Sequence, residues 1–236
     1  MITSADNKKI KQLIRLKQAK YRKSDRQYLV EGPHLVQEAR LAGVLLEAFS
    51  IEEKEGYTQI EASLMRKICS TDTLVGEIGL CQMKFLPKTG DPVLILDGIQ
   101  DPGNMGALMR SAAAFGFTNF WVGQGSVDLF NEKVIRASQG AIFKLSFAFG
   151  KTVDLIATLS DYQIFATDVT QGMPLSEVPP ISKIAVILGN EGNGISEEVK
   201  ALGLKNIYIP MRNTESLNVS VAGGIILYCL QVKNLS

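Results

Sequence analysis

Three segments of the chain combine glycine turns with polar side chains that could bind a ligand. They are DPGNMGALMRSAAAFG at residues 101–116, ILGNEGNGIS at 187–196 and IPMRNTESLNVSVAGGI at 209–225. Each follows or includes the end of a short apolar run with the length of a strand. Glycine turns in front of helices often bind phosphate groups. The first question is therefore whether these turns bind a nucleotide.

The first segment lacks the fingerprints of the common phosphate loops, since it contains neither GxGxxG nor GxxxxGK. Asn104 could cap the helix that follows. Helical spacing predicts a core-facing side made of Leu108, Ser111, Ala112 and Phe115. Arg110 then lies roughly 200° away around the helix. It therefore meets solvent, a ligand or a second subunit.

The other two segments also combine glycines with polar residues. In the second, Glu191 lies inside a glycine loop that is either a tight turn or a ligand site. Its carboxylate would repel a phosphate but suits a neutral or cationic ligand. In the third, Gly223 and Gly224 fall within a predicted helix that Ser216 or Asn218 could cap. Each mid-helix glycine costs about 1 kcal/mol relative to alanine, so we expect close packing to offset that cost.

Short apolar runs alternate with helical stretches from residue 93 onward. The expected strands are VLILDG, NFWVG, KLSFAFG, QIFATD, IAVILGN and NIYIP. The expected helices are 105–115, 131–138, 152–160, 196–202 and 218–232. This alternation predicts an α/β domain whose parallel sheet is covered by helices on both faces. Ligands bind beyond the carboxyl ends of strands in such sheets, which is where the three segments lie.

The first 86 residues show a second, smaller α/β pattern. An amphipathic helix is predicted over 7–23 and another helix over 60–68. Between them lie a strand at QYLVEGP, a helix at HLVQEARLAG and a strand at VLLEAFSIE. Prolines and a glycine mark a linker at 87–92. We therefore expect two domains, 1–86 and 93–236.

The net charge of +1 is distributed unevenly. Residues 1–30 hold nine basic and two acidic side chains, a net charge of +7, which leaves about −6 on the remainder. A basic arm of this kind is typical of polyanion binders, although a solvated lysine-rich helix has the same composition. Besides Lys17, the basic residues are candidates for polyanion contact: Lys8, Lys9, Lys11, Arg15, Lys20, Arg22, Lys23 and Arg26.

Several other chemistries are disfavoured by composition. His34 is the only histidine, and Cys69, Cys81 and Cys229 are scattered without a CxxC pair. Neither a metal site nor a Ser-His or Cys-His nucleophile is expected from this set. No apolar run approaches the roughly 18 residues of a membrane span, and the polar N-terminus lacks a signal-peptide pattern. We expect a cytoplasmic protein with no metal and no membrane partner.

Taken together, DGIQDPGNMGALMRSAAAFG, ILGNEGNGIS and IPMRNTESLNVSVAGGI resemble the three motifs of the SpoU (TrmH-like) family within the SPOUT superfamily. Its members are S-adenosylmethionine-dependent RNA 2′-O-ribose methyltransferases. The stretch KYRKSDRQYLVEGPHLVQEA is similar to the small ribosomal-protein-like RNA-binding domain of the rRNA-modifying branch. The resemblance covers about residues 92–234. It implies a SPOUT domain with a deep C-terminal trefoil knot, a homodimer formed through that domain, and RNA as the partner of the basic arm.

The resemblance also implies roles for individual residues, and its cofactor needs no phosphate loop. The cofactor-binding positions are Gly189, Asn190, Ile209, Met211, Leu217 and Asn218. The catalytic positions are Asn104, Arg110, Glu191, Ser216 and Asn218. In the family, the arginine matching Arg110 is proposed to assist deprotonation of the 2′-hydroxyl. Because arginine stays protonated, stabilising the developing alkoxide and gripping phosphate is the alternative.

The leading hypothesis is methylation of 23S ribosomal RNA, because the N-terminal domain is complete. Transfer RNA is the nearest alternative substrate. An RNA-binding assembly factor without turnover is another alternative, against which the intact motif residues argue. A doubly wound oxidoreductase is disfavoured by the missing dinucleotide fingerprint. The link RNTE, which is shorter than in many members, predicts a tight cofactor loop.

Overall fold

The computed structural model describes residues 1–71, 73–84 and 92–235. These residues form two compact units, of which the first comprises Met1–Lys84 together with Asp128–Phe143. The second unit comprises the rest of the described chain. The linker prediction falls mostly outside the described residues, so the domain boundaries stay a prediction. The sequence places residues 128–143 in the larger domain, whereas the structure groups them with the first unit.

The first unit contains a four-stranded sheet with the order β1-β4-β2-β3. Strand β4 pairs antiparallel with both β1 and β2, and β3 pairs parallel with β2. The elements are α1 (Lys8–Arg15), α2 (Ala19–Asp25), β1 (Gln27–Glu31), α3 (Pro33–Leu41), β2 (Leu45–Ser50), β3 (Thr58–Gln59), α4 (Ala62–Ile68), β4 (Glu77–Gln82) and α6 (Glu132–Ser138), followed by the 3-10 helix η1 (Ala141–Lys144). The small α/β domain expected from the sequence is thus present, although β3 and β4 were not predicted.

The predicted helix over 7–23 is broken into two helices, and Arg22 accounts for the break. Helix α1 ends at Arg15 and α2 begins at Ala19. The guanidinium of Arg22 donates hydrogen bonds to the carbonyls of Leu16 at 2.8 Å and Lys17 at 2.7 Å. These carbonyls lie where a continuous helix would have to bond to later amides. A side chain therefore satisfies them instead of another helical turn.

The second unit contains a seven-stranded sheet with the order β7-β6-β5-β10-β8-β11-β9. All its strand pairs are parallel, which confirms the predicted parallel sheet. The elements are β5 (Val93–Asp97), α5 (Pro102–Ala114), β6 (Asn119–Gly123), β7 (Ser146–Gly150), α7 (Thr152–Ala157), β8 (Gln163–Thr167), β9 (Met173–Pro174), the 3-10 helix η2 (Leu175–Glu177), β10 (Ile184–Gly189), α8 (Glu197–Lys200), β11 (Lys205–Tyr208) and α9 (Val219–Leu235). The trefoil knot stays a prediction.

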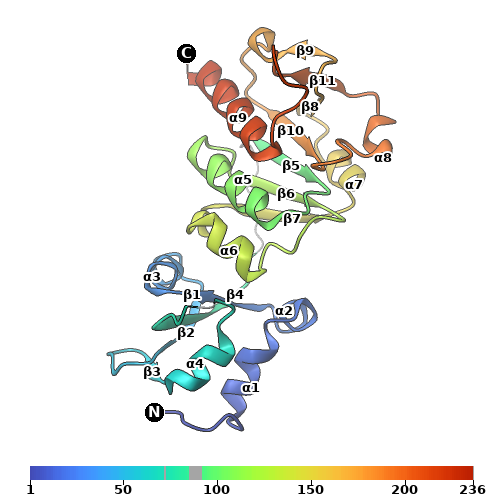
Figure 1. Ribbon diagram of the computed structural model, residues 1–236. Coiled ribbons are helices and arrows are strands. Elements are labelled where there is room, and N and C mark those ends of the chain that lie inside the picture. The colour runs from blue at the N-terminus through green and yellow to red at the C-terminus, as the bar shows by residue number, and fades with distance from the viewer. Residues whose placement is uncertain (72, 85–91, 236) are drawn as a thin grey trace. The chain divides into compact units, whose positions relative to one another are not determined.

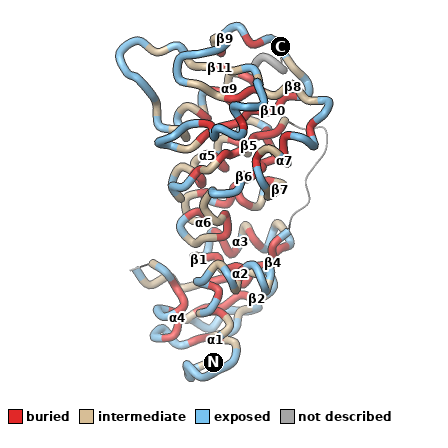
Figure 2. Tube along the Cα trace, turned by 90° about the vertical axis from the view of Figure 1, so that its right-hand side faces the viewer, coloured by how far each residue is buried: buried red, intermediate tan, exposed pale blue. Residues whose placement is uncertain are grey.

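Helices cover both faces of this sheet, as the sequence predicts. Figures 1 and 2 show α5 and α9 on one side of the central strands and α7 on the other. Every residue of β5, β6 and β10 is buried, which is expected for central strands of a parallel sheet. The buried positions of these strands form the core of the unit (Figure 2).

Close packing of α9 against α5 explains one of the mid-helix glycines. A Cβ atom at Gly223 would lie 2.4 Å from Cδ2 of Leu108 and 2.8 Å from Cδ1 of Leu188. At Gly224 the nearest atom would be Oγ of Ser111, at 3.4 Å. The expected close packing is therefore present at Gly223, where it involves side chains of α5 and β10. Helix α9 consequently sits directly over the end of β10, beside the glycine loop.

Candidate functional site

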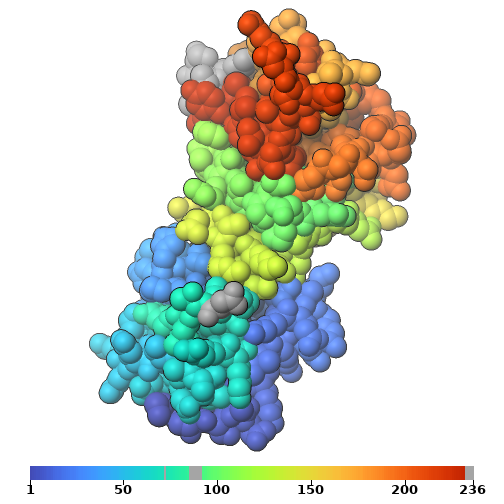
Figure 3. Space-filling view, in the orientation of Figure 1, coloured from blue at the N-terminus to red at the C-terminus, as the bar shows by residue number. Residues whose placement is uncertain are grey.

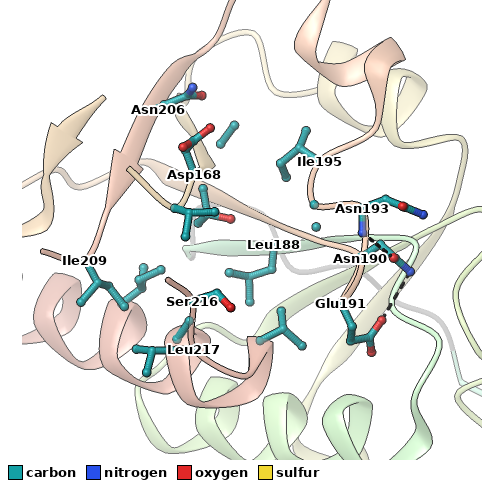
Figure 4. A pocket seen from close by; sticks show the side chains of 18 of the residues that line it. Asp168, Leu188, Asn190, Glu191, Asn193, Ile195, Asn206, Ile209, Ser216 and Leu217 are labelled. Carbon is teal, nitrogen blue, oxygen red and sulfur yellow. Dashed lines mark hydrogen bonds between the residues drawn. The ribbon is translucent and has the colours of Figure 1, made fainter. Parts of the chain in front are cut away.

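A cavity of about 950 Å³ lies at the carboxyl ends of β8, β10 and β11. This volume falls within the range of small-molecule sites. Its apolar lining includes Leu188, Ile195, Ile209, Leu217 and Ile226. Its polar lining includes Asp168, Asn190, Glu191, Asn206 and Ser216 (Figure 4). The cavity thus combines apolar walls with a few polar side chains, which is typical of a site for an organic ligand.

Most of the site residues implied by the resemblance line this cavity. They are Gly189, Asn190, Glu191, Ile209, Met211, Ser216, Leu217 and Asn218. Asn104 and Arg110 are not among the lining residues. The structure therefore brings the second and third motif segments to one cavity, and the first segment contributes from beside it.

The glycine loop between β10 and α8 is closed by Asn190. The backbone of Asn190 exchanges hydrogen bonds with Gly194 at 2.9 and 3.0 Å, and its side-chain oxygen accepts from two amides inside the loop. Its Nδ2 donates to the carbonyl of Gly98 at 2.8 Å. Gly189 has no room for a side chain, because a Cβ there would lie 2.2 Å from the carbonyl carbon of Gly194. These contacts set the shape of the cavity wall.

The carboxylate of Glu191 holds this loop against the beginning of α5. It accepts hydrogen bonds from the amides of Gln100 at 3.3 Å and Asp101 at 3.1 Å, and from Nδ2 of Asn104 at 3.1 Å. Burial opposes ionisation, but hydrogen bonds to the carboxylate outweigh it and hold the pKa of Glu191 below its usual value. Glu191 is therefore ionised at neutral pH, and its oxygens are already occupied.

A chain of hydrogen bonds joins the three motif segments. The N-cap of α5 is Asp101 and not Asn104, because Oδ1 of Asp101 accepts a hydrogen bond from the backbone amide of Asn104 at 2.7 Å. The side-chain oxygen of Asn104 accepts from Nδ2 of Asn218 at 3.0 Å. Asn218 in turn accepts from the amide of Ser220 at 2.9 Å and so caps α9. Asn104 thus links Glu191 to the start of the last helix.

Arg110 lies in the middle of α5 and is exposed. Of the predicted core side, Leu108 and Ala112 are fully buried, whereas Ser111 and Phe115 are half-buried. Arg110 is more exposed than all four, as the helical spacing predicts. Within the described part of the chain its guanidinium forms neither a hydrogen bond nor an ion pair. All its donors are free to bind an external anion.

Asp97 is a functional candidate that the sequence prediction missed. It is buried at the end of β5, where Oδ1 accepts from Oγ1 of Thr152 at 2.6 Å and Oδ2 accepts from the amide of Ser196 at 2.8 Å. Gly123 makes room for this contact, since a Cβ there would lie 2.2 Å from Oγ1 of Thr152. Asp97 therefore anchors the far end of the glycine loop. A carboxylate at the end of a buried strand, as the first residue of the segment that resembles the first motif, was the available signal.

The basic residues predicted to contact a polyanion are not equally available. Arg22 is 4% exposed, and its guanidinium donates to Oδ2 of Asp128 at 2.6 Å. Because Arg22 is buried and fully engaged, it is not at a surface that RNA can reach, and this corrects the prediction. Three other residues form ion pairs within the unit: Lys9 with Glu47, Lys11 with Asp6, and Arg15 with Asp25.

The remaining candidates lie at the surface. Lys8, Lys20, Lys23 and Arg26 are exposed, and the ammonium of Lys20 lies 4.7 Å from the ring centroid of Tyr21. Among the described residues, Lys8 and Lys23 form no ion pair. The basic surface of the first unit is therefore smaller than the composition indicates and centres on α2.

The fold and the cavity define an α/β protein with a cavity suited to an organic ligand at the ends of parallel strands, in the same chain as a small α/β unit. Residues 91–228 match the SpoU rRNA Methylase family, and residues 7–78 match the MRM3-like substrate binding domain. The chain therefore belongs to the SpoU rRNA methylase family.

Individual relatives resemble the chain over its whole length. The 23S rRNA (guanosine(2553)-2′-O)-methyltransferase RlmP of Bacillus subtilis (strain 168) is 31% identical over 244 residues, which cover 98% of both chains. The structure of a protein assigned to the TrmH family of RNA methyltransferases from Porphyromonas gingivalis is 29% identical, with a TM-score of 0.85 and 98% of both chains covered. An AdoMet-bound rRNA methyltransferase from Sinorhizobium meliloti shares the fold at 24% identity, with a TM-score of 0.88, over 100% of this chain and 98% of that one.

Proposed function

We propose that this protein transfers a methyl group from S-adenosylmethionine to a ribose 2′-hydroxyl of RNA, and that this RNA is 23S ribosomal RNA. The observation that carries the proposal is the hydrogen-bond chain from Glu191 through Asn104 to Asn218. It joins all three motif segments beside one cavity. Family membership supports the reaction, and the printed activity of the relative RlmP supports the substrate.

The cavity has apolar and polar walls that suit the adenosine part and the methionine part of S-adenosylmethionine. Leu188, Ile209 and Leu217 offer apolar walls for an adenine ring, and the loops on either side offer backbone polar groups. Ser216 adds a hydroxyl in the same cavity (Figure 4). When bound, the cofactor supplies a methyl group already activated on a sulfonium. The protein must then hold a 2′-oxygen in line behind that methyl, and such positioning supplies much of the rate.

Arg110 is the group we assign to the RNA side of the reaction. Its guanidinium is exposed and stays protonated, so it can bind a phosphate and stabilise an oxygen that gains negative charge. Glu191 is a poor proton acceptor, because hydrogen bonds to its carboxylate hold its pKa low. We therefore assign Glu191 and Asn104 to positioning α5, and hence Arg110, relative to the glycine loop.

The first unit is the proposed RNA-binding part. The match to an MRM3-like substrate binding domain supports this role, together with the exposed cations Lys8, Lys20 and Lys23. Phosphate contacts by lysine and arginine account for most non-specific RNA affinity and make it depend on salt. None of the helices within the described residues has the length and apolar character of a membrane span. The cytoplasm is the proposed location of the reaction, and a ribosomal RNA substrate supports this proposal.

The proposed dimer interface lies on the second unit, on an exposed side of α9. Val221, Ile225 and Tyr228 on α9 are 50%, 38% and 53% exposed, and their spacing puts them on one side of the helix. Figure 3 shows α9 at the surface beside α5. A second copy would cover this apolar stripe through a symmetric contact. Light scattering should give the mass of a dimer, and Ile225→Asp should give a monomer; a monomeric wild-type protein would contradict this assignment.

Transfer of labelled methyl groups tests the reaction directly. Unmodified ribosomal RNA and transfer RNA are incubated with the full chain and labelled S-adenosylmethionine, and nuclease digestion then locates the label. Label on ribose in 23S ribosomal RNA is the expected result. Label on ribose in transfer RNA would support the reaction but show that the substrate is transfer RNA. No label, together with no cofactor binding, would favour an RNA-binding assembly factor.

A further inference from the structure

The cavity has a second polar end that the motif residues do not use. Asp168 and Asn206 line the cavity at this end, away from Glu191 (Figure 4). The pairing of β11 with β8 brings them together, because Asn206 pairs with Ala166 and the carbonyl of Ile207 accepts from the amide of Asp168 at 3.0 Å. Neither residue belongs to the three motif segments, so the family motifs assign them no role.

The loop after β8 is built to present one carboxylate oxygen of Asp168. Oδ1 accepts hydrogen bonds from the amides of Thr170 at 3.0 Å and Gln171 at 2.9 Å. Burial opposes ionisation, but these bonds outweigh it and lower the pKa of Asp168. The backbone amide of Val169 also bonds to this carboxylate, but among the residues that the structure describes no side chain donates a hydrogen bond to it, and a carboxylate has about four acceptor positions. Asp168 therefore carries an ionised oxygen with unused hydrogen-bonding capacity.

Asn206 is held beside Asp168 by the same loop. Gly172 has a φ of +113°, and a Cβ there would lie 2.3 Å from the carbonyl oxygen of Asn206. Only glycine allows the loop to pack this closely. The side-chain amide of Asn206 makes no hydrogen bond with any described residue. An open carboxylate oxygen and an open amide thus face one end of the cavity.

We infer that Asp168 and Asn206 bind the ribose hydroxyls of the adenosine part of S-adenosylmethionine, an inference that rests on the proposed function. A carboxylate accepts from both hydroxyls of a vicinal diol, and an amide can donate to or accept from the same groups. Carboxylates bind adenosine ribose in dinucleotide-binding folds through the same chemistry.

The alternative occupant is the amino group of the methionine part, and the chemistry of Asn206 disfavours it. An ammonium group only donates, so it leaves the donors of the Asn206 amide without a partner. Lys200 also lines the cavity, but its ammonium is paired with Glu197 at 2.7 Å.

Asp168→Asn is the informative variant, because it keeps one oxygen for the amides of the turn and removes the charge from the other. Affinities are measured by calorimetry for three ligands: S-adenosylhomocysteine, 5′-methylthioadenosine, and 5′-methylthioadenosine lacking both ribose hydroxyls. We expect the variant to weaken the first two by at least about tenfold and to leave the third unchanged. Asn206→Ala should show the same pattern with a smaller loss. Asp161→Asn, at an exposed aspartate paired with Lys183, is the control.

Other outcomes overturn the assignment. A loss confined to S-adenosylhomocysteine would place the amino group at Asp168 instead. Equal losses for all three ligands would mean that Asp168 only shapes the loop, and no loss would mean that it contacts no ligand. If the wild-type protein fails to bind S-adenosylhomocysteine, the proposed function itself fails, and this inference with it.

Discussion

The two compact units use their polar side chains in opposite ways. In the first unit, cations are mostly bonded to groups of the same unit, as Arg22 is to Asp128 and Arg15 is to Asp25. In the second unit, Glu191, Asn104 and Asn218 are joined by hydrogen bonds, and Glu191 and Asn218 also line the cavity. Arg110 is left without a partner among the described residues. A count of charges along the sequence therefore overestimates the number of cations that the first unit can offer to RNA. The same count does not reveal that Arg110 of the second unit is available to bind an anion.

Arg110→Ala is the substitution with the largest expected effect. Losing a group that stabilises developing charge typically costs about 100- to 1000-fold in turnover. Because Arg110 does not line the cavity, the affinity for S-adenosylhomocysteine should stay within about twofold, a range of less than 0.5 kcal/mol. Single-turnover methyl transfer and calorimetry measure the two quantities.

The matched control for Arg110 is Arg66→Ala, at an exposed position on α4 in the first unit. That variant should retain the rate of transfer at saturating RNA. Near-normal turnover in Arg110→Ala would remove Arg110 from the site, and the comparison between the two units would lose its main support.

Arg22→Met tests whether that arginine is structural. The change leaves Asp128 and the carbonyls of Leu16 and Lys17 without their donors. Breaking a buried pair in this way costs roughly 3 kcal/mol. Urea unfolding should show a loss of this size in the free energy of unfolding, while the salt dependence of RNA binding by the folded protein stays unchanged. A reduced salt slope would return Arg22 to the RNA surface.

The helix break at Arg22 shows what sequence patterns can and cannot predict. The amphipathic helix could be predicted because helical spacing is local, and Ile10 and Leu13 of that segment are fully buried. The break between α1 and α2 was not predicted, since the guanidinium that satisfies Leu16 and Lys17 is also paired with Asp128, more than 100 residues away. No local pattern records such a partner.

The cavity gives the same lesson. Gly189 and Asn190 were recognisable because glycine loops at strand ends have a local signature. In the sequence, Asp168 looks like the last residue of one apolar strand and Asn206 like the first residue of another. Their shared position follows only from the parallel pairing of β8 with β11, which strand patterns do not specify.

Lys20→Ala combined with Lys23→Ala tests the part of the basic surface that remains available. Each lost phosphate contact should reduce the slope of log affinity against log salt by roughly one, so the pair should reduce it by about two. Lys11→Ala with Arg15→Ala removes two cations that already pair with Asp6 and Asp25. These paired cations should change the slope less. Equal effects of the two double variants would mean that internal ion pairs do not limit RNA contact.

Glu191→Gln should have the smallest effect, and only part of the pH range reveals it. The folded pKa of Glu191 lies below its usual value of 4.5. Its ionised form therefore stabilises the fold above about pH 4.5, and this contribution is lost as the pH falls through the folded pKa. Wild type should be more stable than Glu191→Gln at pH 7, and the difference should shrink as the pH drops below 4.5.

The rate of methyl transfer separates positioning by Glu191 from proton transfer by it. If Glu191 only holds Asn104 and the start of α5, the variant should lose only part of the rate at pH 7, because the side-chain oxygen of glutamine still accepts hydrogen bonds. Loss of a general base would instead cost about 100- to 10,000-fold in rate, since an amide cannot take up the proton. The same carboxylate would then have to give up hydrogen bonds from Gln100, Asp101 and Asn104 to accept from a hydroxyl of RNA. Because those donors connect the glycine loop to α5, such an exchange would open the link between the motif segments at the moment when Arg110 must be held in place.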